Sequence, residues 1–148
     1  ASAGGFVGIV IDKYMMNHEI GFGRRILTIL EEENIPYEHM PSGIDSQVVI
    51  VREKFMSREV EERVLERIRE ELKPDSVAVN RDLDLLMLVG EGMSQATGMF
   101  AKSAQALAAA EVNVLMLNQG ASMVSFMLAI KSPDRAKAVR AIYGAFFG

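Results

Sequence analysis

The stretch LLMLVGEGMSQATG, residues 85–98, joins an apolar run to a bend rich in Gly, Glu and Ser and ends on a glycine that opens an alanine-rich segment. The stretch GIVIDKYMMNHEIG, residues 8–21, has the same layout near the N-terminus. Subtracting 21 from 98 gives an offset of 77, which also relates Met16 to Met93 and Gly43 to Gly120 with no gap. The sequence therefore predicts two copies of one unit.

The composition limits the classes of protein to which this chain can belong. Its 148 residues are 49% hydrophobic and 7% aromatic, which is typical of one globular domain or two small ones with an aliphatic core. A net charge of −4 provides no basic surface for nucleic acid or for an acidic membrane. The chain has no cysteine, and no stretch is typical of a signal peptide or a membrane span. We therefore expect a cytoplasmic protein, in which residues 1–5 are a flexible linker or a cloning remnant.

The pattern of the first copy predicts the order strand, helix, strand, strand, helix, strand. Apolar runs indicate the strands, Pro36 ends the first helix, and Ser57 caps the second. The predicted elements are strands at 6–13, 37–40, 47–54 and 76–80, and helices that begin at Gly21 and Ser57. This order is the split βαβ, or ferredoxin-like, arrangement.

The second copy repeats this order from residue 84 but ends after its second helix. Strands are predicted at 85–89, 112–117 and 123–130, and helices at 98–110 and 133–147. The sequence thus predicts an α+β fold with two ferredoxin-like βαββαβ units, residues 6–82 and 83–148. The second unit lacks one strand, which we expect to come from a segment upstream of this chain.

Four runs resemble the C-terminal regulatory region of aspartate kinase, which consists of two ACT domains in tandem. They are KYMMNHEIGFGRR (13–25), IPYEHMPSGIDS (35–46), LVGEGM (88–93) and VNVLMLNQGAS (112–122), and the resemblance covers essentially the whole chain. It implies that the ATP and Mg²⁺ sites belong to a kinase domain absent here, so this chain needs no cofactor and does not phosphorylate aspartate. It also implies that the first ACT unit is inserted into the second.

The first bend has the chemistry to bind a free amino acid. Backbone N–H groups at residues 20–23 begin a helix, where the dipole favours a carboxylate. Glu19, Glu38 and Asp45 are the nearest acceptors for ammonium groups, and this surplus of acids favours lysine over threonine. In the family, effectors bind between the first ACT units of two chains, so the resemblance implies a homodimer and the effector-binding residues Met16, His18, Glu19, Gly21, Phe22, Gly23, Tyr37, Glu38 and Asp45.

Other readings of these residues remain open. Without the resemblance, Glu38 and Asp45 are better explained as solvated strand and turn residues, and Met16 and Phe22 as core residues. The second bend offers fewer acids, and its secondary candidates are Ser94, Gln95, Thr97, Asn118, Gln119 and Ser122. No ligand cluster surrounds the two histidines, so no metal site is expected. The alternative functions are a stand-alone ACT sensor not attached to a kinase and a nucleic-acid-binding ferredoxin-like domain, for which the chain lacks basic surface and stacking aromatics.

Overall fold

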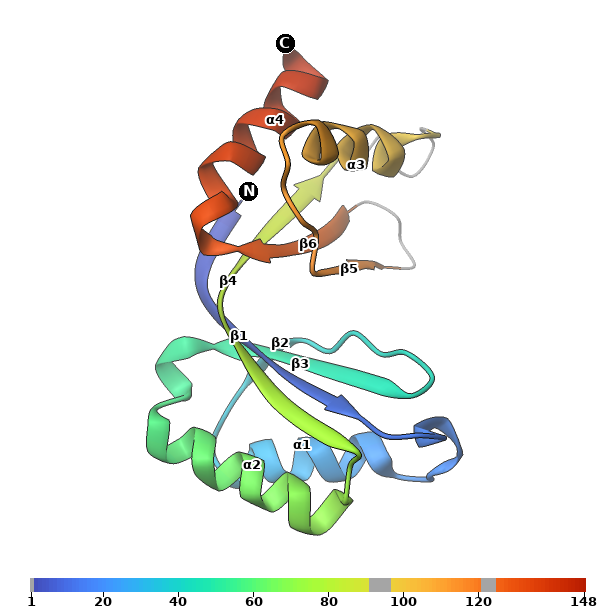
Figure 1. Cartoon of the computed structure of the whole chain (residues 1–148), viewed down its shortest axis with the longest axis vertical. Coiled ribbons are helices and arrows are strands. Elements are labelled where there is room, and N and C mark those ends of the chain that lie inside the picture. Colours follow the sequence, from blue (N-terminus) through green and yellow to red (C-terminus); the bar gives the residue numbers. More distant parts are fainter. Residues whose placement is uncertain (1, 91–96, 121–124) are drawn as a thin grey trace. The chain divides into compact units, whose positions relative to one another are not determined.

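The computed structural model describes residues 2–90, 97–120 and 125–148, and the chain divides into two compact units. We call Gly5–Arg81 the N-terminal unit, and Asp82–Gly148 together with residues 2–4 the C-terminal unit. Both units combine strands with helices, as Figure 1 shows. Within the described ranges, no helix is both long and apolar enough to cross a membrane.

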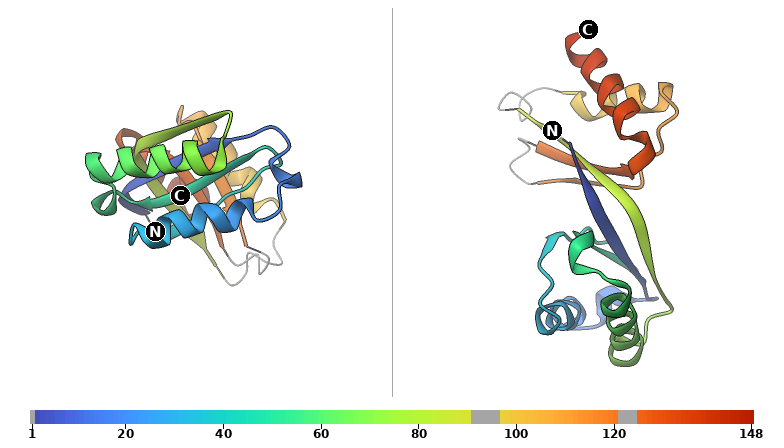
Figure 2. Two further views of the ribbon diagram at one scale, coloured as in Figure 1. Left: turned by 90° about the horizontal axis from the view of Figure 1, so that it is seen from below. Right: turned by 90° about the vertical axis from the view of Figure 1, so that its left-hand side faces the viewer.

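The N-terminal unit has the predicted order of elements. They are β1 (Ser2–Asp12), α1 (Phe22–Glu32), β2 (Tyr37–His39), β3 (Ser46–Arg52), α2 (Arg58–Leu72) and the first half of β4 (Ser76–Val89), with short 3₁₀ turns at η1 (Met16–His18) and η2 (Glu53–Phe55). The strand order is β2-β3-β1-β4, and β3 pairs antiparallel with both β1 and β2. The two helices lie side by side on one face of these strands (Figure 2). The ferredoxin-like order is therefore confirmed for this unit.

Helix α2 illustrates how the sequence specifies local structure here. Val64, Ile68 and Leu72 recur every four residues, and all three are buried against the core beneath the sheet. The Ser57 hydroxyl accepts a hydrogen bond from the Val60 N–H at 3.3 Å, so the predicted N-cap is confirmed. The buried face and the cap together fix where this helix begins and which side it presents to the sheet.

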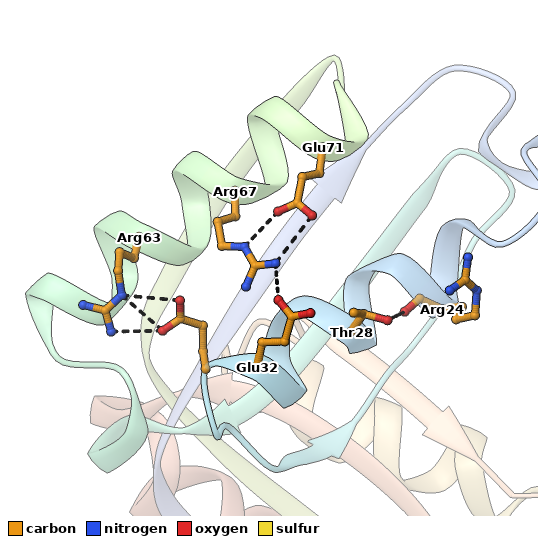
Figure 3. A network of polar contacts seen from close by, with 7 residues as sticks. Arg24, Thr28, Glu32, Arg63, Arg67 and Glu71 are labelled. Atoms are coloured by element: carbon orange, nitrogen blue, oxygen red, sulfur yellow. Dashed lines mark hydrogen bonds and ion pairs between the residues drawn. The ribbon is translucent and has the colours of Figure 1, made fainter.

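A polar network joins the solvent sides of α1 and α2 (Figure 3). Arg67 donates to Glu71 at 2.8 Å and also binds Glu32, while Arg63 pairs with Glu33 at 2.9 Å. These hydrogen bonds raise the pKa values of both guanidinium groups above their usual value. The two helices are thus tied by charge at the surface as well as by apolar packing beneath.

The C-terminal unit uses the second half of β4 as its first strand. It continues with α3 (Met99–Ala109), β5 (Met116–Gln119), β6 (Ser125–Lys131), the 3₁₀ turn η4 (Ser132–Asp134) and α4 (Arg135–Phe147). Strand β6 pairs antiparallel with β4 and with β5. Its core is built from the buried side chains Leu86, Leu107, Val112, Phe126, Leu128, Ile130 and Ala138.

Strand β4 runs unbroken where the sequence predicted two strands separated at residues 81–84. Asp84 lies within this continuous strand and is buried, with 2% of its surface exposed. Its carboxylate pairs with Arg135 at 3.1 Å and accepts a 2.6 Å hydrogen bond from the Ser132 hydroxyl. Because partners on η4 and α4 satisfy this charge, the strand can continue through it.

Residues 2–4 are ordered as strand, so their interpretation as a flexible linker was wrong. They belong to the C-terminal unit, and β1 lies beside β4, which partly fills the strand position expected to be empty. A Cβ atom on Gly4 would lie only 2.9 Å from Asp84 Oδ1 and 2.8 Å from Arg135 Nη1. Glycine therefore permits the close approach of backbone to this ion pair.

The 77-residue offset relates the helix starts of the two units, including Arg58 of α2 and Arg135 of α4, but fails for the strand between the helices. Gly21 and Gly98 cap α1 and α3 with φ angles of 80° and 81°. In contrast, β3 starts at Ser46 and β6 at Ser125, which are 79 positions apart. The repeat therefore needs two additional residues before β6, and the prediction that no gap is required was wrong.

Candidate functional site

A pocket of about 370 Å³ opens beside the bend that joins β1 to α1 in the N-terminal unit. Two segments line it: the bend with the first turn of α1, and the connection from β2 into β3. The lining residues are Met16, Asn17, Glu19, Ile20, Gly21, Phe22, Gly23, Ser42, Gly43, Ile44 and Gln47. This is the bend that the sequence predicted as a binding site.

The helix start gives the pocket a wall of hydrogen-bond donors. Gly21 caps α1 in a left-handed conformation that glycine adopts without strain. The Phe22 N–H donates to the Glu19 carbonyl at 3.2 Å, whereas the Gly23 and Arg24 N–H groups, in the first turn, have no acceptor within the helix. Gly23 also lines the pocket and has no side chain to cover the backbone there. A carboxylate placed here would meet free donors and the positive end of the helix dipole.

Glu19 is the acidic group of the pocket, and its carboxylate is held by two cations. Lys13 Nζ lies 2.8 Å from Glu19 Oε2, and Arg25 Nη2 lies 3.1 Å from Oε1. Hydrogen bonds from Lys13 and Arg25 lower the pKa of Glu19 below its usual value of 4.5, so it is ionised at neutral pH. The buried Phe22 ring lies beneath the same cations, with Lys13 Nζ 5.6 Å and Arg25 Cζ 5.9 Å from its centroid.

The pocket brings together part of the predicted site. Met16, Glu19, Gly21, Phe22 and Gly23 line it, whereas His18, Tyr37, Glu38 and Asp45 do not. Met16 and Phe22 are both buried core members and pocket walls, so the two readings of these residues coexist.

Two acids lie differently from what the sequence suggested. We expected Glu38 to face the bend, but it pairs with Arg52 at 3.0 Å, at the opposite end of β3 from the pocket residue Gln47. The Asp45 carboxylate accepts the Met15 N–H at 2.9 Å. The expectation that Glu38 faces the bend was therefore wrong, and both acids have a tertiary partner that residue type does not reveal. Their roles in binding stay predictions.

Sequence reasoning missed the second wall. Ser42 and Gln47 form an isolated antiparallel bridge, and Gln47 Nε2 donates to Ser42 Oγ at 3.4 Å. Ile20 and Ile44 stand on the rim with 99% and 69% of their surface exposed. No residue in 42–44 was predicted to bind, because only the pairing of β3 with β1 brings this segment beside the bend.

The second bend is described only in part. Thr97 is exposed just before the cap Gly98, and Asn118 and Gln119 are exposed at the end of β5. The other secondary candidates, Ser94, Gln95 and Ser122, lie outside the described residues. Over the part of the chain that the structure describes, no three His, Cys, Asp or Glu side chains group so as to hold a metal ion.

Comparison with known proteins shows what this chain is similar to. An ACT domain family model matches residues 86–146. The chain is 50% identical over 147 residues to Aspartokinase 3 of Bacillus subtilis (strain 168), which covers 99% of this chain and 32% of that protein. The crystal structure of Clostridium acetobutylicum aspartate kinase matches with a TM-score of 0.93 and 35% identity, over 99% of this chain and 34% of that one. The chain is similar over nearly its whole length to the ACT-containing regulatory portion of aspartate kinases.

The chain spans about a third of the relatives just named, and the matched third is their regulatory portion. E. coli aspartokinase III, solved in complex with lysine and aspartate in its T-state, shares the fold with a TM-score of 0.76 at 18% identity, over all of this chain and 32% of that one. The recognition made from the four sequence runs is therefore confirmed.

Proposed function

We propose that this region binds a feedback amino acid in the pocket beside α1 and thereby inhibits phosphorylation of L-aspartate by an attached kinase domain. Lysine is the first candidate and threonine the second, which would place the whole protein in lysine, threonine and methionine biosynthesis. The observation that carries the proposal is a helix N-terminus and an ionised carboxylate facing one pocket. An α-amino acid carries the two complementary charges.

Each part of such a ligand has a counterpart in the pocket. The ligand carboxylate would accept from the first-turn N–H groups of α1, and its α-ammonium group would donate to Glu19. The ligand side chain would lie against Phe22 and the rim residues Ile20 and Ile44. A lysine side chain brings a second ammonium group, and this group needs another acceptor.

A second copy of the chain is a source of that acceptor. Ile20 and Ile44 are large, apolar and exposed at the pocket rim, and such patches mark surfaces that another molecule covers. Glu38 is exposed on β2, the edge strand of the N-terminal unit, and pairs there with Arg52, so a ligand ammonium group in a seam between two copies would share this acid with Arg52. We therefore infer a homodimer through the N-terminal unit, with the effector in the seam.

Inhibition then follows from differential binding. A ligand shifts an equilibrium only by the difference between its affinities for two states, so a seam that changes between active and inactive arrangements is a suitable place for it. We infer that ATP and Mg²⁺ are used by the kinase domain of a cytoplasmic parent protein and not by this region. Support for lysine comes from the lysine complex of the structural neighbour.

Titration calorimetry on the 148-residue chain tests the proposal. Lysine should release or absorb heat at one site per chain, threonine should bind more weakly, and norleucine, which lacks the terminal ammonium group, should bind least. Sedimentation velocity on the same samples should show a dimer that lysine stabilises. No binding of lysine or threonine by a verified dimer would refute the proposal.

A further inference from the structure

Two carboxylates from outside the bend hold the pocket-forming segment between β1 and α1. The Tyr14 N–H donates to Asp75 Oδ2 at 2.7 Å, and the Met15 N–H donates to Asp45 Oδ1 at 2.9 Å. Asp75 lies in the turn from α2 into β4, and Asp45 lies in the connection from β2 to β3. Consecutive backbone donors of the bend are thus bound by acids from two different parts of the unit.

Burial does little to hold this part of the bend. Tyr14 and Met15 keep 75% and 46% of their surface exposed, so neither side chain anchors the segment in the core. Met15 also adopts a left-handed conformation, with φ at 59°, which non-glycine residues rarely take. A strained and exposed segment needs bonds to keep it in one conformation.

Backbone bonds attach the same two segments to the bend. The Lys13 N–H donates to the Asp45 carbonyl at 2.9 Å, and the Asp75 N–H donates to the Asp12 carbonyl at 2.8 Å. Lys13 Nζ donates to the Leu72 carbonyl at 2.7 Å while it pairs with Glu19. The turn after α2 is therefore connected to the acid of the pocket through one lysine.

We propose that Asp75 and Asp45 are positioning residues of the effector pocket, which fix the bend in the conformation that opens the pocket to its ligand. This inference rests on the proposed function, because it assigns the groups that prepare the same site. It also gives Asp45 a role other than contact with the ligand. Affinity falls in proportion to the fraction of molecules in which the bend is correctly formed.

Asp75→Ala removes one carboxylate acceptor and leaves the backbone bonds in place. Loss of one charge-assisted hydrogen bond should raise the lysine Kd about tenfold. Asp75→Asn keeps an oxygen acceptor and should restore most of the affinity. Glu66→Ala, at an exposed acid on α2, is the matched control and should bind as the unaltered chain does. Unchanged lysine affinity in Asp75→Ala would overturn the proposal.

Amide hydrogen exchange separates this inference from the proposed function. The Tyr14 and Met15 N–H groups should exchange faster in Asp75→Ala and in Asp45→Ala, with melting temperatures within about 5 °C of that of the unaltered chain. If neither lysine nor threonine binds the unaltered chain, the proposed function fails. Faster exchange at these two amides would still show that Asp75 and Asp45 fix the conformation of the bend. Unchanged exchange at Tyr14 in Asp75→Ala would overturn it, whatever the calorimetry shows.

Discussion

Gly23→Ala should make the chain more stable and at the same time a weaker binder. Gly23 is the second residue of α1 and lines the pocket. A Cβ atom there would meet only Gln47 Nε2, at 3.9 Å, which is an ordinary contact, so the fold has room for it. Replacing a helical glycine reduces the entropy of the unfolded chain and should add about 0.5 kcal/mol to the free energy of unfolding.

The new methyl group would stand between the ligand and the first-turn N–H groups of α1. Loss of one hydrogen bond to a charged carboxylate should raise the lysine Kd about tenfold or more. For a chain of this size, the gain in stability should raise the melting temperature by about 1 to 2 °C. Differential scanning calorimetry and titration calorimetry measure the two effects on the same sample.

Gly144→Ala supplies the matched control. Gly144 lies within α4, and a Cβ atom there would have no neighbour within 4 Å. This substitution should raise the melting temperature by about 2 to 4 °C, since alanine exceeds glycine by about 1 kcal/mol within a helix, and should leave lysine affinity unchanged. Equal lysine affinities for Gly23→Ala and the unaltered chain would refute the assignment of the pocket.

Three further outcomes are expected. Arg135→Ala should lower the free energy of unfolding, measured in urea, by roughly 2 kcal/mol because it leaves the buried Asp84 carboxylate without its cation. The 47% exposure of the arginine side chain keeps this cost below that of a fully buried pair. A loss below about 0.5 kcal/mol would contradict this. Ser57→Ala should cost about 1 kcal/mol by removing the cap of α2, whereas Ser57→Asp should restore it. Glu19 should titrate by NMR with a midpoint below 4.5, so its ion pairs stabilise the fold above that pH and are lost as the pH falls through the lowered value; a midpoint above 4.5 would contradict the pairing.

The sequence predicted the local structure well wherever one residue determines it. Gly21 and Gly98 begin helices in both copies because their left-handed backbone suits glycine, and Ser57 caps α2 as its side chain predicts. Prediction failed at Asp84, which was placed between two strands but lies in one continuous strand. The partners that make its burial possible, Arg135 and Ser132, are about fifty residues away along the chain, so no local pattern reveals them.

Prediction of the pocket residues was limited in the same way, because tertiary partners are not visible in the local sequence. The bend was recognised because glycine and apolar spacing mark it locally. Which acids remain available to a ligand depends on tertiary pairing, as Glu38 with Arg52 and Asp45 with the Met15 N–H show. Acid count alone therefore does not determine the effector, and the proposal of lysine depends on the pocket and on a second copy of the chain.

The two units share the backbone geometry of their first helix start but differ in the side chains beside it. Both units place a left-handed glycine before a helix, so both present the same donor geometry. At the offset of 77, however, Gly90 replaces Lys13, Ala96 replaces Glu19 and Met99 replaces Phe22. The C-terminal unit thus repeats the helix start without the acid, the lysine that holds it and the aromatic wall. A helix N-terminus alone attracts any anion, whereas recognition of an amino acid also needs an acceptor for its ammonium group, and among these matched positions only the N-terminal unit has one.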